Sequence, residues 1–316
     1  MKVLVTGGAG FIGSHLSEAL LARGDEVICL DNFNDYYSPE RKRRNIAGLL
    51  KSPAFRLYEG DIRDAMAVAA LFERERPQRV VHIAAMAGVR YSIEHPQLYQ
   101  EVNVGGTLVV LEQARRHGVD NFLLASSSSV YGADSHAPFR EDDACARPIS
   151  PYAATKRAAE LLAYTYHHLY GLPCTALRFF TVYGPRGRPD MAPWRFTEAI
   201  YHGRPLQLFG DGSAVRDFTY IDDIIAGVLA ALDAVFPYEI INLGNSRTIA
   251  IADYIALIER IVGKKAQIVR LPPVTGDVPL THADIGKARR LLGFDPQTGV
   301  EEGMERFVAW YRAEVG

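Results

Sequence analysis

The sequence predicts an α/β fold: a Rossmann-type doubly wound parallel sheet with a smaller mixed α/β substrate-binding domain. Short apolar segments rich in β-branched residues alternate with helical patterns through the first half of the chain. Strands that are apolar throughout are typical of a parallel sheet covered by helices on both faces. A glycine-rich segment also joins the first strand to the first helix, which is the usual position of a phosphate-binding turn.

The elements of this sheet follow one another in a regular order. We expect strands at Lys2–Thr6, Val27–Asp31, Phe55–Glu59, Arg79–Ile83, Asn121–Ser126 and Thr175–Phe180. The helical patterns between them cover Phe11–Arg23, Ala65–Arg74, Leu98–His117 and Ala153–Tyr170. Right-handed crossovers between parallel strands then wind the chain into a single sheet.

After Tyr183 this alternation stops, and residues 184–189 have the glycine and proline content of a loop. Shorter elements are expected at Trp194–His202, Leu206–Phe209, Glu239–Leu243, Asp253–Val262 and Ile268–Leu271. The strand at Glu239–Leu243 is placed to rejoin the main sheet. We therefore expect residues 1–180 to form a cofactor-binding domain, with 222–246 returning to it. Residues 181–221 and 247–316 are expected to bind the substrate.

Composition narrows the class of protein. The chain has 316 residues, 48% of them hydrophobic and 23% charged, which argues against disorder. The formal net charge of -2 gives no basic surplus, so we expect no nucleic-acid partner. The run Arg41–Arg44 is the densest cluster of charge, and we expect it to be a solvated helix face.

The cysteines and the apolar runs bear on the compartment. Cys29, Cys145 and Cys174 are far apart, which predicts no disulfide framework and no metal site. The longest uncharged apolar run, Ile224–Leu232, is too short to span a membrane. Residues 1–5 lead directly into the glycine-rich segment, without the longer apolar region of a signal peptide. These observations predict a cytoplasmic protein with no membrane partner.

The glycine-rich segment predicts a dinucleotide site. Its glycines recur at every third position, at Gly7, Gly10 and Gly13. Glycine permits the tight turn and lets the backbone approach a pyrophosphate. The helix that begins at Phe11 and Ile12 would then direct free N–H groups and its positive dipole end at the phosphates.

The end of the second strand predicts which dinucleotide is bound. Asp31 follows Gly13 by 18 residues, and an acid there accepts hydrogen bonds from both adenosine ribose hydroxyls. Its charge would repel a 2′-phosphate, and the next three residues contain no arginine. We therefore predict NAD, not NADP, as the cofactor. The adenosine side of the site is expected to include Asp31, Asn32, Asn34, Asp61 and Ile62.

Two further motifs predict catalysis. A serine-rich segment, residues 126–129, ends the fifth strand, and Tyr152 and Lys156 open the following helix. Residues four apart lie on one face of a helix. An ammonium beside a phenol favours the phenolate and lowers its pKa from about 10 toward neutrality. Tyr152 is therefore a candidate general base near pH 7.

With these motifs the sequence resembles the extended short-chain dehydrogenase/reductases, specifically their nucleotide-sugar epimerases and dehydratases, from Met1 to about Trp310. The resemblance implies that Tyr152 is the catalytic base. Lys156 would orient Tyr152 and the nicotinamide ribose, and Ser127 would hold the sugar O4. It also implies a helix start at Val102 and Asn103 beside NAD, and further NAD contacts from Ala84, Ala85, Ala87, Val102, Tyr152, Lys156 and Phe179.

The residues after Ser127 bear on the reaction. Dehydratases of this superfamily carry an acidic pair where this chain has Ser128 and Ser129, and a hydroxyl cannot perform that proton transfer at neutral pH. The segments 31–37, 87–92 and 179–192 resemble those of UDP-glucuronate 4-epimerases. The resemblance implies that Thr181 and Arg188 receive the sugar carboxylate, with donors from Ser128 and Ser129. It further implies substrate contacts from Arg90, Arg195, Gln207, Phe209, Arg216 and Asp277.

The predicted reaction is NAD-dependent inversion at C4 of UDP-glucuronate through a transient 4-keto sugar, giving UDP-galacturonate. The alternatives are a 4-epimerase for UDP-glucose or UDP-N-acetylglucosamine, and a UDP-glucuronate decarboxylase. A protein of a different class, a non-catalytic NAD-binding regulator, would be expected to lack the Tyr152–Lys156 pair. The resemblance also implies a homodimer, in which the helices at Leu98–His117 and Ala153–Tyr170 of two copies form a four-helix bundle.

Overall fold

The computed structural model describes residues 1–133, 135–272 and 278–315. Its main body is a seven-stranded sheet in the order β10-β6-β5-β4-β1-β2-β3, with every neighbouring pair parallel. The predicted Rossmann-type α/β fold is therefore confirmed. The strands are β1 (Lys2–Thr6), β2 (Glu26–Asp31), β3 (Phe55–Glu59), β4 (Arg79–His82), β5 (Asn121–Ser127), β6 (Cys174–Phe179) and β10 (Tyr238–Leu243).

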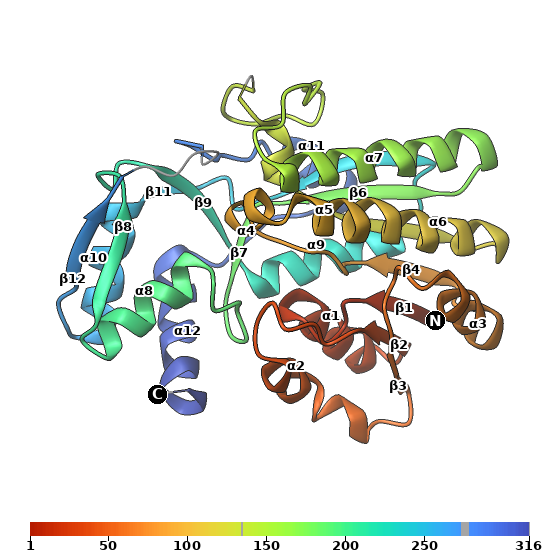
Figure 1. Ribbon diagram of the computed structural model, residues 1–316, viewed down its shortest axis with the longest axis horizontal. Helices are drawn as coiled ribbons and strands as arrows, with labels where there is room; N and C mark the ends of the chain where they lie inside the picture. The colour runs from red at the N-terminus through yellow and green to blue at the C-terminus, as the bar shows by residue number, and fades with distance from the viewer. Residues whose placement is uncertain (134, 273–277, 316) are drawn as a thin grey trace.

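Helices cover both faces of this sheet (Figure 1). Val3 and Val5 of β1 face one apolar core, and Leu4 between them faces the other. Because successive side chains point to opposite faces, a strand buried on both sides has to be apolar throughout. The first core is closed by α1 (Phe11–Ala22), α2 (Pro39–Ile46) and α9 (Ile221–Asp233), and the second by α3 (Ala65–Glu75), α6 (Thr107–Arg116) and α7 (Pro151–Tyr170).

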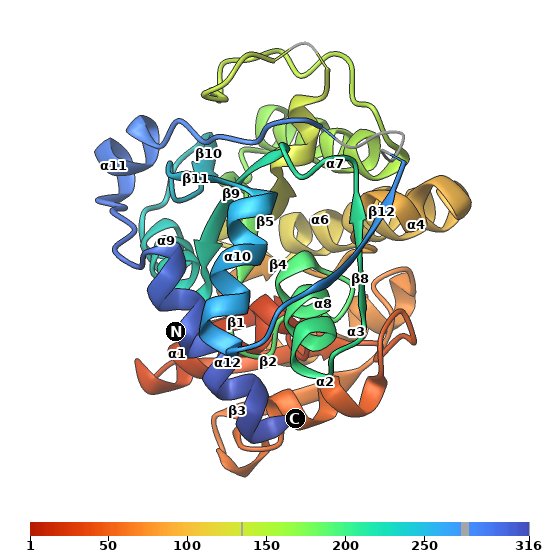
Figure 2. The same ribbon diagram turned by 90° about the vertical axis from the view of Figure 1, so that its left-hand side faces the viewer.

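A second lobe lies beyond the carboxyl ends of the sheet strands, and it faces the viewer in Figure 2. It contains a three-stranded sheet of β7 (Thr181–Tyr183), β9 (Val215–Tyr220) and β11 (Thr248–Ala250), and a parallel pair of β8 (Pro205–Phe209) with β12 (Gln267–Leu271). Helices α8 (Ala192–Tyr201), α10 (Ile251–Val262) and α12 (Val300–Glu314) support these strands. Trp194, which is fully buried, packs edge-on against Phe307 and Tyr311.

Strand β10 connects the two parts of the chain. After β9 in the second lobe, α9 and β10 return to the main body, where β10 pairs with β6 at the edge of the sheet. Helix α11 (Gly286–Leu292) then follows β12 and packs against β10. The strand expected at Glu239–Leu243 thus lies in the main sheet. The exact domain boundaries remain a prediction.

The prediction of a single helix at Leu98–His117 is wrong in detail, because the structure divides this stretch into several elements. Helix α4 (Val89–Glu94) and the short α5 (Pro96–Tyr99) come first, and residues Gln100–Gly106 form a π-helical turn before α6. Val102 and Asn103, expected at a helix start, lie inside this turn. The Asn103 side chain accepts from the Met86 N–H at 2.7 Å and donates to Thr155 at 3.1 Å. This wider turn therefore ties the loop after β4 to α7, a common setting for π-helical turns.

The basic run on α2 is only partly the solvated face that we expected: Arg43 and Arg44 are exposed, but Arg41 and Lys42 are not. Lys42 is buried, and its ammonium donates to the backbone and side-chain oxygens of Asn34, both at 2.8 Å. The Arg41 guanidinium lies over the ring of Trp194 at 4.3 Å, and Arg43 pairs with Glu59 at 2.8 Å. Helix α2 therefore links the loop after β2 to the second lobe.

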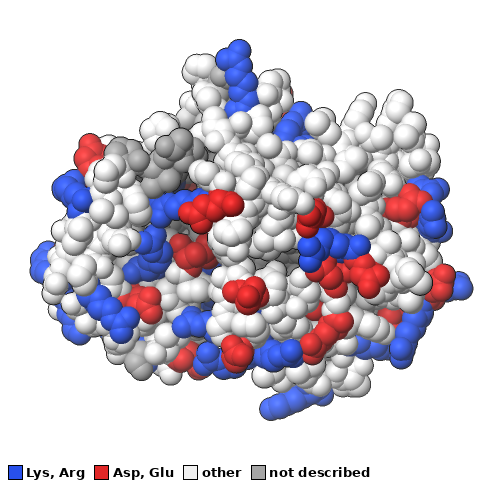
Figure 3. Space-filling view, viewed as in Figure 1, with Lys and Arg blue, Asp and Glu red and all other residues white. Residues whose placement is uncertain are grey.

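The molecular surface carries mixed charge. Basic and acidic side chains are interspersed over the face shown in Figure 3, which is hollowed between the second lobe and the main body. Within residues 1–133, 135–272 and 278–315, no helix combines the length and apolar character that crossing a bilayer requires. The same residues contain no cluster of ligands suited to a metal ion. All three cysteines are buried and unpaired.

Candidate active site

One cavity of about 1070 Å³ lies between the glycine-rich turn, the carboxyl ends of the sheet strands and the second lobe. Residues predicted to contact the cofactor line one part of it: Gly7, Gly10, Phe11, Ile12, Gly13, Asp31, Asn32, Asn34, Ile62, Ala84, Ala85, Ala87, Val102 and Phe179. Residues predicted for catalysis and sugar binding line the rest: Arg90, Ser127, Ser128, Ser129, Tyr152, Lys156, Thr181, Arg188, Arg195, Gln207, Phe209 and Arg216.

Two predicted residues are not part of that lining. Asp61 lies behind Asn32, which donates to its carboxylate at 3.0 Å, and it also binds Arg63 at 2.8 Å. The hydrogen bonds from Arg63 lower the pKa of Asp61 to about 2. Asp61 thus supports Asn32 from outside the cavity. Asp277 lies outside the described residues.

The glycine-rich turn has the shape that a pyrophosphate site requires. Gly7 has a φ of 71°, and a Cβ there would lie 2.8 Å from the backbone nitrogen of Ala84. A Cβ on Gly13 would lie 2.1 Å from the Gly7 carbonyl oxygen. Helix α1 has no side-chain cap at its N-cap residue, Gly10, so the N–H groups of its first turn remain for a ligand. An anionic phosphate fits this cradle.

Asp31 occupies the position of a ribose acceptor at the end of β2. The residue is 8% exposed, and its carboxylate accepts from the N–H groups of Ala9 at 3.1 Å and Phe33 at 2.9 Å. Each carboxylate oxygen has a second lone pair for a ribose hydroxyl. Burial raises the pKa of Asp31, although these hydrogen bonds and the charge of Lys42 oppose the shift. The donors and the acceptor therefore suit NAD.

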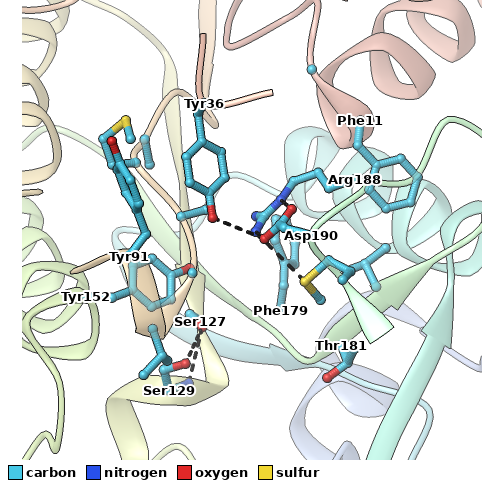
Figure 4. Close-up of a pocket in the computed structure, with 18 of the residues that line it drawn as sticks. Phe11, Tyr36, Tyr91, Ser127, Ser129, Tyr152, Phe179, Thr181, Arg188 and Asp190 are labelled. Atoms are coloured by element: carbon cyan, nitrogen blue, oxygen red, sulfur yellow. Dashed lines mark hydrogen bonds and ion pairs between the residues drawn. The ribbon is translucent and has the colours of Figure 1, made fainter. Parts of the chain in front are cut away.

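Tyr152 and Ser127 face each other across the reacting part of the cavity (Figure 4). Ser127 ends β5, and its hydroxyl accepts from the Ser129 N–H and donates to the Ser129 hydroxyl, both at 3.2 Å. Ser150 caps α7 by accepting from the Ala153 N–H at 3.1 Å, which sets the first turn that carries Tyr152. The Ser127 side chain is close enough to the Tyr152 phenol to lower its pKa.

The lowered pKa predicted for Tyr152 is not what the structure shows. Burial raises the pKa of Tyr152, and the Ser127 side chain and the charge of Arg188 only partly oppose this shift. The Lys156 ammonium, which was expected to lower it, donates to the Ala125 carbonyl oxygen at 2.8 Å. Burial also lowers the pKa of Lys156 to about 8, opposed by the charge of Glu160. Desolvation is therefore the largest cause of the shift at both residues.

Behind Lys156 lies a buried ion pair that sequence reasoning missed. Glu160 accepts from Arg178 through two hydrogen bonds of 2.9 Å and from Ser126 at 2.6 Å. Both members of the Glu160–Arg178 pair have fully buried side chains. The sequence did place Glu160 one turn after Lys156 on α7. It gave no sign of the partner, because Arg178 comes from β6. This pair joins α7 to the strand ends beneath the serines.

The predicted carboxylate receptor, Arg188, already holds a carboxylate of this chain. Its Nε and Nη2 donate to Asp190 Oδ1 at 2.9 Å and Oδ2 at 2.6 Å, and the Tyr36 hydroxyl donates to Oδ2 at 3.1 Å. Figure 4 shows the Tyr36 hydroxyl and the Arg188 guanidinium converging on Asp190. Tyr36 and Asp190 also line the cavity, yet neither was predicted as a site residue. The only sequence signal for a role in the site was that each lies two residues after a predicted site residue, Asn34 or Arg188.

The remaining predicted substrate residues gather around the second lobe. Arg195 of α8 donates to Gln207 of β8 at 3.3 Å, and the Arg90 guanidinium lies over the Phe209 ring at 4.0 Å. Arg216 of β9 donates to the Val215 carbonyl at 2.9 Å. These side chains surround the end of the cavity opposite the glycine-rich turn with cations and an aromatic face.

Comparison with known proteins agrees with this geometry. The model of the NAD dependent epimerase/dehydratase family matches residues 3–244. The UDP-glucuronate 4-epimerase of Thermodesulfobacterium geofontis is 48% identical over 99% of this chain and 96% of its own length.

Solved structures agree as well. UDP-glucuronic acid 4-epimerase from Bacillus cereus, solved with UDP-glucuronic acid and NAD, superposes with a TM-score of 0.94 at 39% identity and 99% coverage of both chains. UDP-glucose 4-epimerase from Thermotoga maritima, solved with UDP-glucose, gives a TM-score of 0.93 at 34% identity and complete coverage of both chains. The resemblance identified from the motifs is confirmed: this chain belongs to the NAD dependent epimerase/dehydratase family.

Proposed function

We propose that this protein is an isomerase that interconverts UDP-glucuronate and UDP-galacturonate by inverting C4, with NAD as its cofactor. The observation that carries the proposal is a single cavity that joins three features: the glycine-rich turn, the Tyr152–Ser127 pair and Arg188. The similarity to UDP-glucuronate 4-epimerases over nearly the whole chain supports the same assignment.

Tyr152 is the proposed acid–base residue. The bound NAD would supply the hydride chemistry at C4, taking the hydride from one face of the sugar and returning it to the other. Tyr152 takes the proton of the C4 hydroxyl in the first half of the reaction and returns a proton to O4 in the second. Ser127 shares the O4 hydrogen bond, and Lys156 is placed one turn along α7 to hold the adjacent ribose. The phenolate of Tyr152, which burial disfavours, would gain stability from the positive charge of a bound oxidised nicotinamide.

Arg188 and Thr181 are the proposed receptors of the C6 carboxylate, with Ser128 and Ser129 as additional donors. A planar guanidinium binds a carboxylate through two parallel hydrogen bonds, which fixes orientation as well as affinity. The keto sugar is a β-keto acid, so orientation matters: CO₂ leaves most easily when the C5–C6 bond aligns with the carbonyl π system. Holding the carboxylate away from that alignment protects the intermediate.

The other end of the cavity is the proposed uridine diphosphate site. Arg195 and Arg216 supply positive charge for the diphosphate, Gln207 and Phe209 frame the uracil, and Arg90 covers Phe209. Asp277 stays a predicted ribose contact. This division places the nucleotide on the second lobe and leaves the hexose beside Tyr152.

The decisive experiment is incubation of the purified protein with UDP-glucuronate and NAD, with products resolved by NMR. We expect UDP-galacturonate, and the same equilibrium mixture when the reaction starts from UDP-galacturonate. A UDP-pentose as the main product would identify a decarboxylase instead. No conversion of any UDP-sugar in a panel, together with tight NAD binding, would favour the non-catalytic regulator.

A second candidate function is 4-epimerisation of a neutral UDP-sugar, glucose or N-acetylglucosamine. The specific observation in its favour is the pairing of Arg188 with Asp190, which neutralises the cation that an acidic sugar would need. The similarity to a UDP-glucose 4-epimerase is in line with this candidate. Comparing kcat/KM for UDP-glucuronate and UDP-glucose distinguishes the two: we expect a preference for the acid of at least about 100-fold, corresponding to roughly 3 kcal/mol.

We also propose a homodimer formed through α6 and α7. Apolar side chains on these helices are exposed: Leu108 (42%), Leu161 (51%), Tyr164 (49%), Leu169 (60%) and Tyr170 (52%). Leu111, by contrast, packs fully inside this chain's own core. Sedimentation should give twice the mass of 35.0 kDa, and Leu161→Glu should reduce it to the monomer. A monomeric parent protein would refute the dimer.

The three unpaired thiols support the predicted cytoplasmic location.

A further inference from the structure

The pairing of Arg188 with Asp190 has an unusual geometry for a substrate receptor. Asp190 engages the Nε–Nη2 edge of the guanidinium through hydrogen bonds of 2.9 Å and 2.6 Å. A guanidinium carries five N–H groups in a rigid plane. Asp190 therefore uses one edge of the fork. On the other edge, Nη1 with Nη2, Nη2 also donates to the Met191 Sδ at 3.8 Å, a weak acceptor that a second carboxylate would displace.

Asp190 is itself held in place. The Tyr36 hydroxyl donates to Oδ2 at 3.1 Å, from the loop after β2 on the opposite side of the cavity. Burial would raise the pKa of the Asp190 carboxyl, but the charge and hydrogen bonds of Arg188 and the bond from Tyr36 outweigh it and lower that pKa. Asp190 therefore stays ionised at neutral pH and acts as a fixed acceptor for Arg188.

The backbone at Gly88 makes this cluster possible. Gly88 has a φ of 99°, and a Cβ there would lie 2.8 Å from the Tyr36 hydroxyl, 3.6 Å from Arg188 Nη2 and 3.7 Å from Asp190 Oδ2. Three loops thus converge on one point. The cluster also reaches the reacting centre, because the charges of Arg188 and Asp190 both act on Tyr152.

We propose that Asp190, held by Tyr36, is a positioning residue that fixes the guanidinium plane of Arg188 and thereby sets which product the enzyme makes. The inference rests on the proposed function. With one edge of Arg188 clamped, the other edge meets the sugar carboxylate in a single orientation. A guanidinium without the clamp rotates about its side-chain bonds, and the carboxylate samples the alignment from which CO₂ leaves.

The side reaction that follows is specific. The C5–C6 bond of the 4-keto acid breaks, C6 departs as CO₂, and the electron pair moves through C5 to the C4 oxygen as an enolate. A proton from water at C5 then gives a UDP-4-ketopentose. Return of the hydride held by the cofactor at C4 yields a UDP-pentose, whereas release of the ketopentose leaves the cofactor reduced. Both outcomes are measurable beside the epimer.

The test compares three variants: Asp190→Asn, Tyr36→Phe and Asp142→Asn. Asp142 is a matched control because it pairs with Arg140, also two residues before it, through bonds of 3.2 Å and 3.4 Å on an exposed surface. Each protein is given UDP-glucuronate, and the ratio of UDP-pentose plus reduced cofactor to UDP-galacturonate is measured. The KM for UDP-glucuronate is determined in parallel.

We expect Asp190→Asn to raise the pentose-to-epimer ratio at least about fivefold, which corresponds to roughly 1 kcal/mol between two competing barriers. Tyr36→Phe should raise it less, and Asp142→Asn should leave it unchanged. A fold defect would lower both products together, so the ratio separates positioning from damage. If Asp190→Asn is insoluble, Tyr36→Phe decides the question alone.

Two results would overturn the inference at different levels. An active parent enzyme whose ratio is unchanged in Asp190→Asn and Tyr36→Phe would overturn the role of Asp190 only. A parent protein that does not epimerise UDP-glucuronate would refute the proposed function, and this inference with it.

Discussion

Lys156 donates its ammonium hydrogen to the Ala125 carbonyl oxygen at 2.8 Å, which anchors the first turns of α7 to the end of β5. This contact joins the strand that leads to Ser127 with the helix that carries Tyr152. The spacing between base and serine is therefore set by a lysine that is itself 6% exposed.

Lys156→Met should lower kcat by about 10²-fold or more, because it removes both the anchor and a nearby positive charge. Lys156→Arg, which keeps the charge, is the control and should retain more activity.

The pH dependence of the stability of the protein gives a second test of Lys156. The pKa of Lys156 falls from 10.5 to about 8 on burial, so the unfolded chain binds the extra proton between these values, and stability rises with pH there. In thermal melts, the Tm of the wild type minus that of Lys156→Met should therefore increase from pH 8 to pH 10.5.

Ser127→Ala should shift the acid limb of the kcat profile to higher pH. The Ser127 side chain lowers the pKa of Tyr152, so its removal raises that pKa further above the ordinary value. Less phenolate is then present near neutrality, and turnover at pH 7 should fall by about tenfold for each pKa unit. Ser135→Ala, which removes only a bond to the Tyr131 carbonyl, should leave the profile in place. An unshifted limb in Ser127→Ala would contradict this account.

Asp31→Asn should weaken NAD binding and change how the stability of the protein without NAD depends on pH. The charged carboxylate is worth about 1.5 kcal/mol or more to a ribose hydroxyl, hence at least about a tenfold rise in Kd. Because burial raises the pKa of Asp31 above 3.8, the native state binds the extra proton just above that pH, and wild-type stability falls as pH rises through this window. The Tm difference between variant and wild type should therefore grow upward from pH 3.8. Calorimetry with and without NAD measures both effects.

Gly13→Ala should destabilise the fold and abolish NAD binding. Its Cβ would lie 2.1 Å from a backbone oxygen, so the turn and α1 have to separate. Overpacking of this kind costs about 1–3 kcal/mol. The matched control is Gly48→Ala, whose Cβ would meet nothing within 4 Å; its Tm should match the parent protein. A Gly13→Ala protein that copurifies with NAD would show that the turn tolerates a side chain.

Arg188→Ala should raise the KM for UDP-glucuronate by about 100-fold, the loss expected for a charge-assisted bidentate pair. It should also yield pentose products, since nothing then restrains the C5–C6 bond. Turnover of UDP-glucose, if present, should change little. An unchanged epimer yield with no pentose would remove Arg188 from the carboxylate site.

The sequence predicted the parts of the site that are local. Gly7 to Gly13, the acid at Asp31, and the spacing of Tyr152 and Lys156 each lie within one turn or one helix, where residue type and spacing determine geometry. The parallel sheet was equally predictable, because strands buried on both faces have to be apolar.

What escaped prediction depends on contacts between distant segments. Tyr36 and Asp190 are separated by 154 residues and meet only because two loops converge at Gly88. The pKa of Tyr152 reflects burial that no spacing reveals. Lys42, expected in solvent, is buried because Asn34 offers it two oxygens.

The return of β10 to the edge of the main sheet has a practical consequence for protein engineering. The second lobe is not one continuous stretch of chain but two, before α9 and after β10. A chimera that borrows the lobe of a relative therefore needs two grafts, one between β6 and α9 and one after β10. A single crossover after β6 would also exchange α9 and β10, and it would place foreign side chains against β6 and the buried Arg178.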